Sequence, residues 1–249
     1  MHIIKIQNLS HRFSGGSLGL DNVNLNIREG SFTVITGENG SGKTTLLKHL
    51  NGLLLPTSGS VTIAGKSVST NLIESRQLVG FVFQNPDLQI IGETVFEDVA
   101  FGPRNLCLHP QEVQRRVHEA LSDLNLLAMA DRRPHLLSGG EKRRLAIAGV
   151  LAMNPRVLAL DEPFSSLDYP GFKQVLEQIL ALHRKRHTIV LTSHDIEKVA
   201  VHAEHLVIMK NGKVALEGPP DHVIPELEHF GVRKPCPSRW GKPLESWLT

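Results

Sequence analysis

A glycine-rich stretch, Gly-Glu-Asn-Gly-Ser-Gly-Lys-Thr at residues 37–44, constrains this chain more than any other feature. It fits the pattern G-x-x-x-x-G-K-[ST] and lies between a short apolar run, residues 31–35, and a predicted helix, residues 43–50. Glycines let successive backbone N–H groups point at phosphate oxygens, and the start of the helix adds the positive end of its dipole. The stretch therefore predicts a phosphate-binding βα unit of an α/β protein, with an ordinary βα turn as the alternative.

Two side chains in this stretch have specific roles in phosphate chemistry. The Lys43 ammonium is predicted to contact the β- and γ-phosphates, and the Thr44 hydroxyl to bind Mg²⁺. The residues that we expect to surround the nucleotide here are Gly37, Asn39, Gly40, Ser41, Gly42, Lys43, Thr44 and Thr45. The ligand that this predicts is a nucleoside triphosphate with Mg²⁺.

A pair of carboxylates follows the apolar run at residues 157–160. In an open α/β sheet, ligands bind at the carboxyl ends of the strands, which is also the edge that carries the glycine loop. We therefore expect Asp161 to hold Mg²⁺, directly or through water, and Glu162 to orient and deprotonate an attacking water. An acidic strand end is often only solvated, but the neighbouring glycine loop favours the functional interpretation.

The remaining pattern predicts an α/β core that is interrupted by helices. Apolar runs typical of strands lie at residues 3–6, 23–27, 61–63, 79–83, 188–191 and 205–208, and a hairpin turn is predicted at residues 210–213. Residues from about 94 to 153 have helical patterns instead. Two helices there begin with the spacing of a capping box, Thr94 with Glu97 and Ser138 with Glu141.

The second of these helix starts has an unusual composition, Leu-Ser-Gly-Gly-Glu at residues 137–141. Mutual capping by Ser138 and Glu141 explains a well-formed helix start but not the glycines. Gly139 and Gly140 lower helix stability, and they are useful where a ligand must approach the backbone closely. The exposed N–H groups of this turn predict a second anion site.

These motifs, in this order, resemble the nucleotide-binding subunit of ATP-binding-cassette (ABC) transporters over roughly residues 1–220. The resemblance implies that Phe13 stacks on adenine, where a plain core Phe is the alternative. It implies that Gln84 reaches Mg²⁺ and the membrane partner, and that His194 contacts the γ-phosphate. Residues 165–168, Ser-Ser-Leu-Asp, match the D-loop of the family.

The resemblance also implies a fold and a domain organisation. We expect one α/β domain, residues 1–249, with a RecA-like P-loop NTPase core, antiparallel strands at the N-terminus and an inserted all-helical subdomain. The nucleotide-binding core would comprise residues 1–90 and 154–220, the helical subdomain residues 91–153, and a C-terminal extension residues 221–249. ATP and Mg²⁺ are the expected cofactors.

In this family two ATPase subunits pair head to tail, and each ATP lies between the glycine loop of one and the Leu-Ser-Gly-Gly-Glu helix of the other. The resemblance thus implies that Ser138, Gly139 and Gly140 bind the ATP of a second subunit. Both a homodimer and a heterodimer with a second ABC ATPase remain open. Since the motifs are complete here, a self-paired chain would have two competent sites.

Two further stretches, residues 83–89 and 94–103, look like the ATPases of energy-coupling-factor (ECF) importers, which take up cobalt, nickel or vitamins. The ECF pattern usually has two acidic residues before the glutamine, and here the second is Leu88. The implied partners are a membrane T component and a substrate-binding membrane subunit, on the cytoplasmic face of the membrane. The length of 249 residues favours the metal-type or self-pairing members. Another ABC transporter class and a non-transport ABC ATPase are the alternatives.

Composition excludes several other classes. Net charge is only +2, which gives no electrostatic case for nucleic acid as a partner. No apolar run approaches the roughly 18–20 residues of a spanning helix, and the start of the chain lacks the layout of a secretory signal. Two cysteines make no disulfide framework, which suggests a reducing compartment. His183 and His187 straddle a helix end and a strand start, so we expect a solvated surface there rather than a metal site.

Overall fold

The structure is a computed structural model that describes residues 1–239 and 241–248. Trp240 and Thr249 of the expected C-terminal extension lie outside the described residues. The strands are β1 (His2–Arg12), β2 (Leu18–Arg28), β3 (Phe32–Thr36), β4 (Ser58–Ile63), β5 (Lys66–Ser67), β6 (Val79–Val82), β7 (Val157–Leu160), β8 (Thr188–Thr192), β9 (His205–Lys210) and β10 (Lys213–Gly218). The α-helices are α1 (Lys43–Leu50), α2 (Leu72–Leu78), α3 (Val95–Asn105), α4 (Pro110–Asp123), α5 (Gly139–Leu151), α6 (Tyr169–Arg184), α7 (Pro220–Val223) and α8 (Cys236–Arg239).

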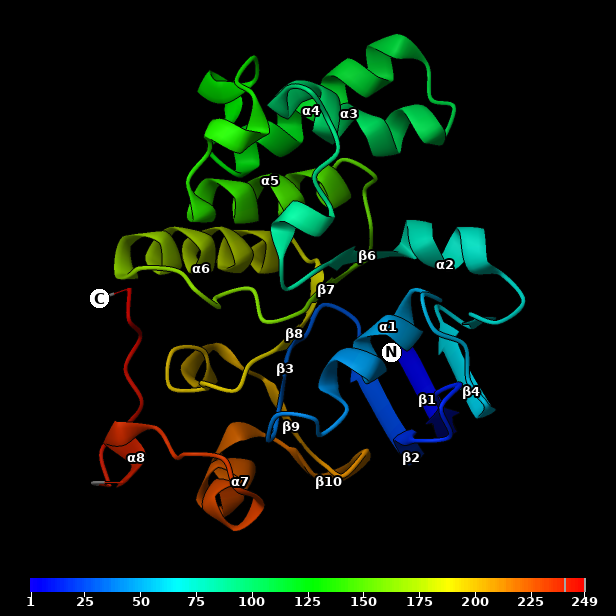
Figure 1. The fold of residues 1–249 in the computed structure, drawn as a ribbon. Helices are drawn as coiled ribbons and strands as arrows, with labels where there is room; N and C mark the ends of the chain where they lie inside the picture. The colour runs from blue at the N-terminus through cyan, green and yellow to red at the C-terminus, as the bar shows by residue number, and fades with distance from the viewer. Residues whose placement is uncertain (240, 249) are drawn as a thin grey trace.

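A six-stranded sheet in the order β10-β9-β3-β8-β7-β6 forms the centre of the molecule (Figure 1). The five strands from β9 to β6 are parallel, and β10 alone is antiparallel. Every residue of β3, β6, β7 and β8 is buried, as expected for parallel strands that are covered on both faces. The carboxyl ends of β3, β6, β7 and β8 therefore meet at one edge of the sheet.

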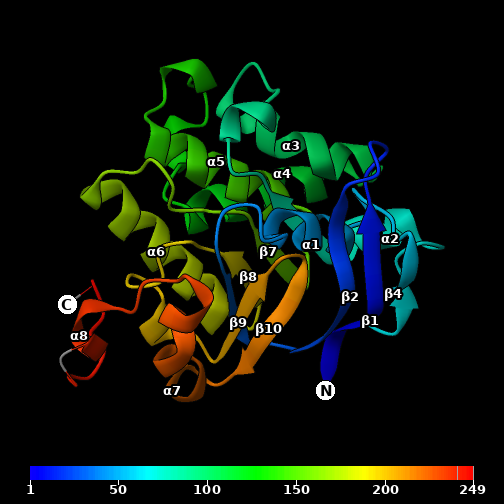
Figure 2. The same cartoon turned by 60° about the horizontal axis from the view of Figure 1, so that its bottom comes forward.

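A second sheet, with the antiparallel order β2-β1-β4-β5, lies beside the first (Figure 2). Buried apolar residues recur along β1 and β2, and they join α1 in a core that is shared with one face of the large sheet. The α/β architecture with N-terminal antiparallel strands is confirmed. The sequence pattern did not predict the short strand β5 or the helix α2.

Helices α3, α4 and α5 form a lobe above α6 (Figure 1). Their apolar sides share one core with α6 and the second face of the large sheet. The predicted capping box of α5 is present. The predicted box of α3 is wrong in one half: Thr94 accepts from the Glu97 N–H, but no return bond completes it. The first two N–H groups of α3, of Val95 and Phe96, donate to backbone carbonyls of the segment before α5.

The turn between β9 and β10 joins the two sheets. Asn211 and Gly212 both have positive φ, 49° and 76°, which confirms the predicted hairpin turn. The Gly212 N–H donates to the Ser41 carbonyl at 3.0 Å, and the Gly212 carbonyl accepts from the Asp21 N–H of β2 at 2.9 Å. A Cβ atom on Gly212 or on Gly42 would lie 3.0 or 2.9 Å from the Gly19 carbonyl oxygen. We call this contact of Gly19, Gly42 and Gly212 the glycine seam.

After β10 the chain forms α7, a 3₁₀ segment (Ile224–Phe230) and α8. The segment that follows α8 returns to the main core, where Leu244, Trp247 and Leu248 are partly buried. None of the described helices has the length and hydropathy needed to cross a bilayer.

Candidate active site

The glycine loop turns sharply between the end of β3 and the start of α1. Gly37, Gly40 and Gly42 have φ of 144°, 79° and 103°, a region that side chains disfavour. At Gly37 the space is also closed, since a Cβ atom would lie 2.1 Å from the Met209 carbonyl oxygen. Glycine is therefore required at Gly37 by both backbone conformation and packing.

The Lys43 side chain lies inside this loop. Its ammonium donates to the carbonyl oxygens of Gly37 and Glu38 at 2.8 and 2.9 Å. Burial lowers the pKa of Lys43, and the carboxylates of Glu162 and Asp161 partly oppose this shift. A buried ammonium held by neutral carbonyls and two nearby carboxylates is well placed for an anion.

Three segments meet at Asp161. The Thr44 hydroxyl donates to both carboxylate oxygens at 2.9 Å, and the Thr192 hydroxyl donates to Oδ1 at 2.8 Å. Thr192 Oγ1 also accepts from the Glu162 N–H at 2.8 Å. Asp161 is buried, and the carboxyl ends of β7 and β8 bring Asp161 and Thr192 together. The sequence interpretation gave Thr192 no role, although its place at the end of an apolar strand was the same signal that identified Asp161.

Glu162 and His194 form a second contact at this edge. The Nδ1 atom of His194 lies 3.0 Å from Oε2 of Glu162. The Glu162 side chain is 11% exposed and that of His194 is 58% exposed. Glu162 has a φ of 45°, a left-handed conformation that is uncommon outside glycine and recurs at functional sites. The two residues that we expect to be catalytic, Glu162 for the attacking water and His194 for the γ-phosphate, thus lie side by side.

Phe13 lies at the mouth of the same pocket. It follows β1, is 41% exposed, and meets the His11 ring edge to face at 4.8 Å. A Cβ atom on Gly19 would lie 2.6 Å from the Phe13 ring, so glycine there lets the ring lie against β2. The pocket, of about 440 Å³, is lined by Phe13, Leu18, Gly19, Asn39, Gly40, Ser41, Gly42, Lys43, Thr44, Thr45, Gln84, Glu162 and His194.

Gln84 is exposed where the chain leaves β6, and it lines the glycine-loop pocket. Two neighbours that the sequence interpretation missed fix this stretch. The Phe83 N–H donates to Gln89 Oε1 at 3.1 Å, and the buried Arg143 guanidinium donates to the Phe83 carbonyl at 2.8 Å. Arg143 also reaches Ser165 Oγ at 3.4 Å. An arginine in a helix has no sequence signal that distinguishes this role from a solvated one.

The Leu-Ser-Gly-Gly-Glu helix start lies apart from this pocket. Ser138 and Glu141 cap each other, and the backbone N–H of Ser138 lowers the pKa of the Glu141 carboxyl. A Cβ atom at Gly139 would meet open space, whereas one at Gly140 would lie 3.4 Å from the Gly171 Cα. Gly140 is thus partly explained by packing within the chain. Gly139 lines a separate pocket with the D-loop, and Ser138 and Gly140 do not line the glycine-loop pocket.

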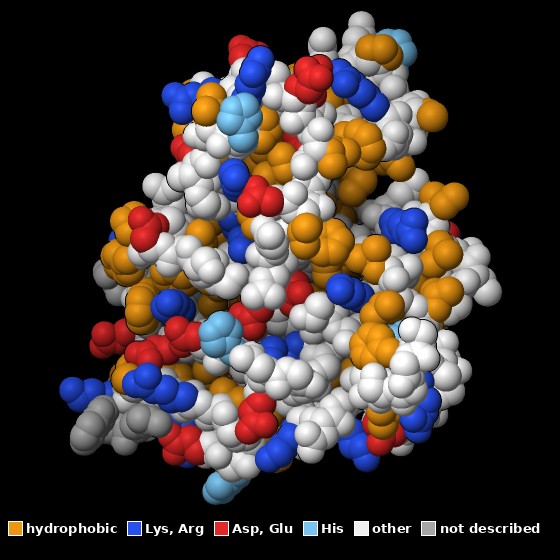
Figure 3. All heavy atoms as spheres, viewed as in Figure 1, with side chains coloured by type: hydrophobic (Ala, Val, Ile, Leu, Met, Phe, Trp, Pro, Cys, Tyr) orange, Lys and Arg blue, Asp and Glu red, His pale blue; other side chains and the backbone are white. Residues whose placement is uncertain are grey.

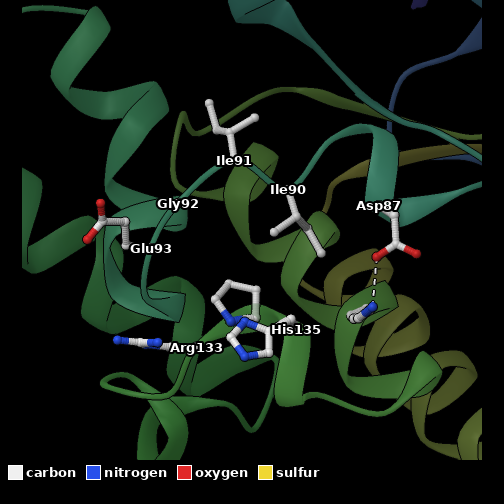
Figure 4. Close-up of a pocket in the computed structure, with 9 residues that line it drawn as sticks. Asp87, Ile90, Ile91, Gly92, Glu93, Arg133 and His135 are labelled. Atoms are coloured by element: carbon white, nitrogen blue, oxygen red, sulfur yellow. Dashed lines mark hydrogen bonds and ion pairs between the residues drawn. The ribbon is translucent and has the colours of Figure 1, made fainter.

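A groove of about 550 Å³ opens between residues 87–93 and the segment from residue 133 to α5 (Figure 4). It is lined by Asp87, Ile90, Ile91, Gly92, Glu93, Arg133, Pro134, His135 and Lys142. Asp98 fixes its rim, because the N–H groups of Ile91 and Gly92 both donate to Asp98 Oδ1, at 2.7 and 2.9 Å. Lys142 pairs with Asp87 at 2.8 Å across one end. We call this the Ile91 groove.

Hydrophobic side chains gather on this face between the helical lobe and α2 (Figure 3). Leu88 and Ile91 are 74% and 61% exposed beside the Ile91 groove, and Ile73 of α2 is 76% exposed. Apolar side chains that gather on one face are typical of a contact surface, whereas singly scattered ones are not.

The two histidines considered as a metal pair bind backbone carbonyls instead. His183 Nε2 lies 2.9 Å from the Gly30 carbonyl, and His187 Nδ1 lies 3.0 Å from that of Pro155. Burial lowers the pKa of His187. Within residues 1–239 and 241–248 no group of three or more His, Cys, Asp or Glu side chains is arranged to hold a metal.

Comparison with known proteins gives one consistent result. The family model described as "ABC transporter" matches residues 20–165, which is more than half of the chain. The energy-coupling factor transporter ATP-binding protein EcfA of Methanocaldococcus jannaschii is 43% identical over 92% of this chain and 83% of its own length. EcfA2 of Symbiobacterium thermophilum is 46% identical over 94% of this chain and 85% of its own length.

Solved structures agree with the sequence relatives. CbiO1 from Clostridium perfringens, described as part of the ABC transporter complex CbiONQ, has a TM-score of 0.83 and 37% identity, with 92% of each chain covered. A dimeric ATP-binding cassette in a post-hydrolysis state, bound to ADP and Pi, has a TM-score of 0.77 and 32% identity, with 87% of this chain and 98% of that chain covered.

Proposed function

The chain belongs to the ABC transporter ATP-binding family and is an ATP-hydrolysing subunit, and from that premise we propose that it drives an ECF-type importer. The observation that carries the proposal is the meeting of Lys43, Thr44, Asp161, Glu162 and His194 at one sheet edge, beside the Ile91 groove. The first feature supports ATP hydrolysis and the second supports a membrane partner.

The pocket suits a nucleoside triphosphate. The backbone N–H groups of residues 39–45 and the Lys43 ammonium would hold the phosphates, at the start of α1. Phe13 would stack on the adenine at the other end of the pocket. Ser41 Oγ is buried without a hydrogen-bond partner, so phosphate binding would also supply a partner there.

The residues present fit a Mg²⁺ ion. Thr44 Oγ1 and the Asp161 carboxylate lie together, and Gln84 lines the same pocket as Thr44. One carboxylate and neutral oxygens that complete their shell with substrate phosphates are a typical Mg²⁺ site. When bound, Mg²⁺ neutralises charge on the transferring phosphoryl group.

Hydrolysis would be carried out by Glu162 and His194. The Glu162 carboxylate would accept a proton from the attacking water, and His194 would hold that carboxylate while reaching the γ-phosphate. The buried Asp161–Thr192–Glu162 bonds fix the backbone of Glu162, and His194 contacts its carboxylate, so both would orient the base before ATP binds.

Two cassettes would share each ATP. Ser138 and Gly140 do not line the pocket that contains Lys43, and the space beyond Gly139 is open. The helix start of α5 would therefore meet the phosphates bound by another subunit. Since every motif is present in this chain, a homodimer with two active sites is the simplest assembly, and a heterodimer is the alternative.

The Ile91 groove would receive a helix of a membrane T component. It combines exposed Ile91 with charges of both signs, and Leu88 is exposed in the same segment. Lys142 of the groove is followed by Arg143, which contacts Ser165. A separate membrane subunit would bind the cargo, a cobalt or nickel ion or a vitamin. We favour the metal-type importers, and we place the chain at the cytoplasmic face as a peripheral subunit.

Glu162→Gln tests the catalytic assignment. The variant should bind ATP with unchanged affinity, lose ATP turnover by at least about 100-fold, and accumulate as a closed dimer on size-exclusion chromatography with ATP. Glu93→Gln is the matched control, because Glu93 lies in the Ile91 groove, and it should hydrolyse ATP at the wild-type rate. Wild-type turnover in Glu162→Gln would refute the assignment.

Co-expression with a candidate T component tests the transport assignment. Ile91→Asp should abolish the complex on pull-down while basal ATPase activity persists, since Ile91 lines the groove and not the nucleotide pocket. Leu127→Asp, at a 40% exposed apolar residue outside the groove, should leave the complex intact. The groove assignment would be contradicted if both variants lost the complex equally, or if both still formed it as wild type does.

A further inference from the structure

The C-terminal segment docks on the start of α6. The Trp247 ring meets the Phe172 ring edge to face at 5.7 Å and lies 6.1 Å from that of Tyr169. The Tyr169 hydroxyl donates to the Trp247 carbonyl at 3.2 Å. Figure 1 shows the C-terminal end of the chain beside α6. Tyr169 is the first residue of α6 and directly follows the D-loop residue Asp168, which caps the helix.

A line of aromatic rings continues from this contact to Glu162. Phe172 packs against the Phe164 ring at 5.1 Å with an interplanar angle of 65°. Phe164 is two residues beyond Glu162 in the chain. The Trp247 ring is therefore connected through two edge-to-face contacts to the backbone that presents the Glu162 carboxylate.

A second line runs from Trp247 to His194. The Lys198 ammonium lies 5.3 Å from the centre of the Trp247 ring and 5.2 Å from that of Phe172. Lys198 is four residues beyond His194, and buried Ile196 and Val199 anchor the segment between them. Ser246 Oγ also meets His202 Nε2 at 3.2 Å, on the 3₁₀ turn that follows.

The two sets of contacts meet at the catalytic pair, because Nδ1 of His194 lies 3.0 Å from Oε2 of Glu162. Together they form a closed ring of residues. We propose that Trp247 is a positioning residue, which holds the chain segments behind Glu162 and His194 at a fixed separation. Four contacts join the members of this ring, and the chain itself makes the other two links, from Glu162 to Phe164 and from His194 to Lys198. Trp247 does not line the pocket of Lys43 and Phe13, so it acts on the orientation of the catalytic pair and not on nucleotide binding.

This inference rests on the proposed roles of Glu162 and His194, and it adds a function for the C-terminal segment. Glu162 is held from two sides: Thr192 fixes its N–H from within the sheet, and the Phe164–Phe172–Trp247 line supports the segment after it. The His194 side chain is 58% exposed, whereas that of Glu162 is 11% exposed. Loss of Trp247 should therefore disturb His194 more than Glu162.

The test compares turnover with binding in four variants. Trp247→Ala should lower kcat for ATP hydrolysis roughly tenfold, in the range expected for sub-ångström misplacement of catalytic groups, with the nucleotide Kd within about twofold of wild type. Trp247→Phe keeps a ring on Phe172 and Lys198 and should restore kcat to within about threefold. Lys198→Met should lower kcat less than Trp247→Ala. Glu245→Ala, exposed on the same segment, should match wild type.

A double-mutant cycle on kcat separates positioning from general loosening. If Trp247 and Lys198 act on the catalytic pair through the same set of contacts, the fold-loss of kcat in the double variant should be clearly smaller than the product of the two single fold-losses. Thermal unfolding identifies any variant that does not fold. In that event Tyr169→Phe, which removes only the hydroxyl that donates to the Trp247 carbonyl, should still lower kcat with an unchanged Kd.

Two results would overturn the positioning role: wild-type kcat in Trp247→Ala, or independent, multiplicative losses in the cycle. Failure of the catalytic assignment gives a different result: Glu162→Gln would then hydrolyse ATP at the wild-type rate. If Glu162→Gln is inactive while Trp247→Ala is fully active, only the role of Trp247 is lost.

Discussion

Thr192 makes two buried hydrogen bonds at the active site, and Thr192→Val removes both with little change in shape. The variant loses a donor to the Asp161 carboxylate, at 2.8 Å, and leaves the Glu162 N–H without its acceptor, also at 2.8 Å. A hydrogen bond to a charged group contributes about 1.5–3 kcal/mol, and an unsatisfied buried donor costs about 1–3 kcal/mol. Allowing for local relaxation, we expect the free energy of unfolding to fall by about 3 kcal/mol.

Thr188→Val is the matched control, because Thr188 lies on the same strand and is also buried. Its hydroxyl accepts one hydrogen bond, from the Gly30 N–H at 2.9 Å, far from the catalytic edge. We expect a loss of about 1–2 kcal/mol there, from one unsatisfied donor, with unchanged kcat. Thr192→Val should in addition lower kcat, because Asp161 and Glu162 both lose a fixed position.

Urea unfolding and steady-state ATP hydrolysis on the two variants measure these effects. For a chain of this size a loss of about 3 kcal/mol corresponds to a fall in Tm of roughly 6–12 °C. The reasoning is refuted if the free energy of unfolding of Thr192→Val lies within about 0.5 kcal/mol of the wild-type value. It is also refuted if both variants retain the same kcat, since the hydroxyl of Thr192 would then do nothing for the carboxylates.

Three further predictions concern the glycine loop, the start of α5 and the buried His49 of α1. Gly37→Ala should lose more than about 3 kcal/mol of stability in urea unfolding, because its Cβ atom would lie 2.1 Å from the Met209 carbonyl oxygen at a φ of 144°; a stable, active variant would show that the loop yields easily. Ser138→Arg should abolish turnover and ATP-driven dimerisation while equilibrium binding of nucleotide to the monomer persists, because Ser138 is outside the pocket of its own chain. Burial lowers the pKa of His49, helped by nearby His11 and opposed by hydrogen bonds to backbone carbonyls. The unfolded chain therefore binds the proton first, so stability is lost as pH falls below about 6.5, and His49→Gln should show a smaller drop in Tm between pH 7.5 and 5.5.

The sequence predicted the parts of the site that are local in the chain. The glycine loop and the start of α1 follow from one contiguous motif, and Asp161 and Glu162 follow from an apolar strand with an acidic end. The same logic could have identified Thr192. It is the last residue of the apolar strand β8, and Asp161 directly follows the apolar strand β7. The pairing of β7 with β8, which brings the two together, is a long-range contact without a local signal.

Contacts between distant segments could not be predicted. Arg143 resembles any basic residue of an amphipathic helix, yet it is buried and binds the Phe83 carbonyl. Trp247 lies in a polar, proline-rich tail, and nothing in that pattern indicates its place on Phe172. The bonds from the first two N–H groups of α3 to the carbonyls of Arg132 and Ala130 are likewise long-range contacts without a local signal. The division of the chain into core, helical subdomain and extension stays a prediction.

The glycine seam holds two parts of the nucleotide pocket rigidly together. Gly19, Gly42 and Gly212 bring three backbones into contact with no side chain between them, and the Gly212 amide is bonded to the loop on one side and to β2 on the other. No compressible side-chain layer separates the support of Phe13 from the loop around Lys43, so the two travel as a single block. A Cβ atom on Gly42 or Gly212 would push apart the strand that supports Phe13 and the loop around Lys43, and would thus disturb both ends of the nucleotide pocket at once.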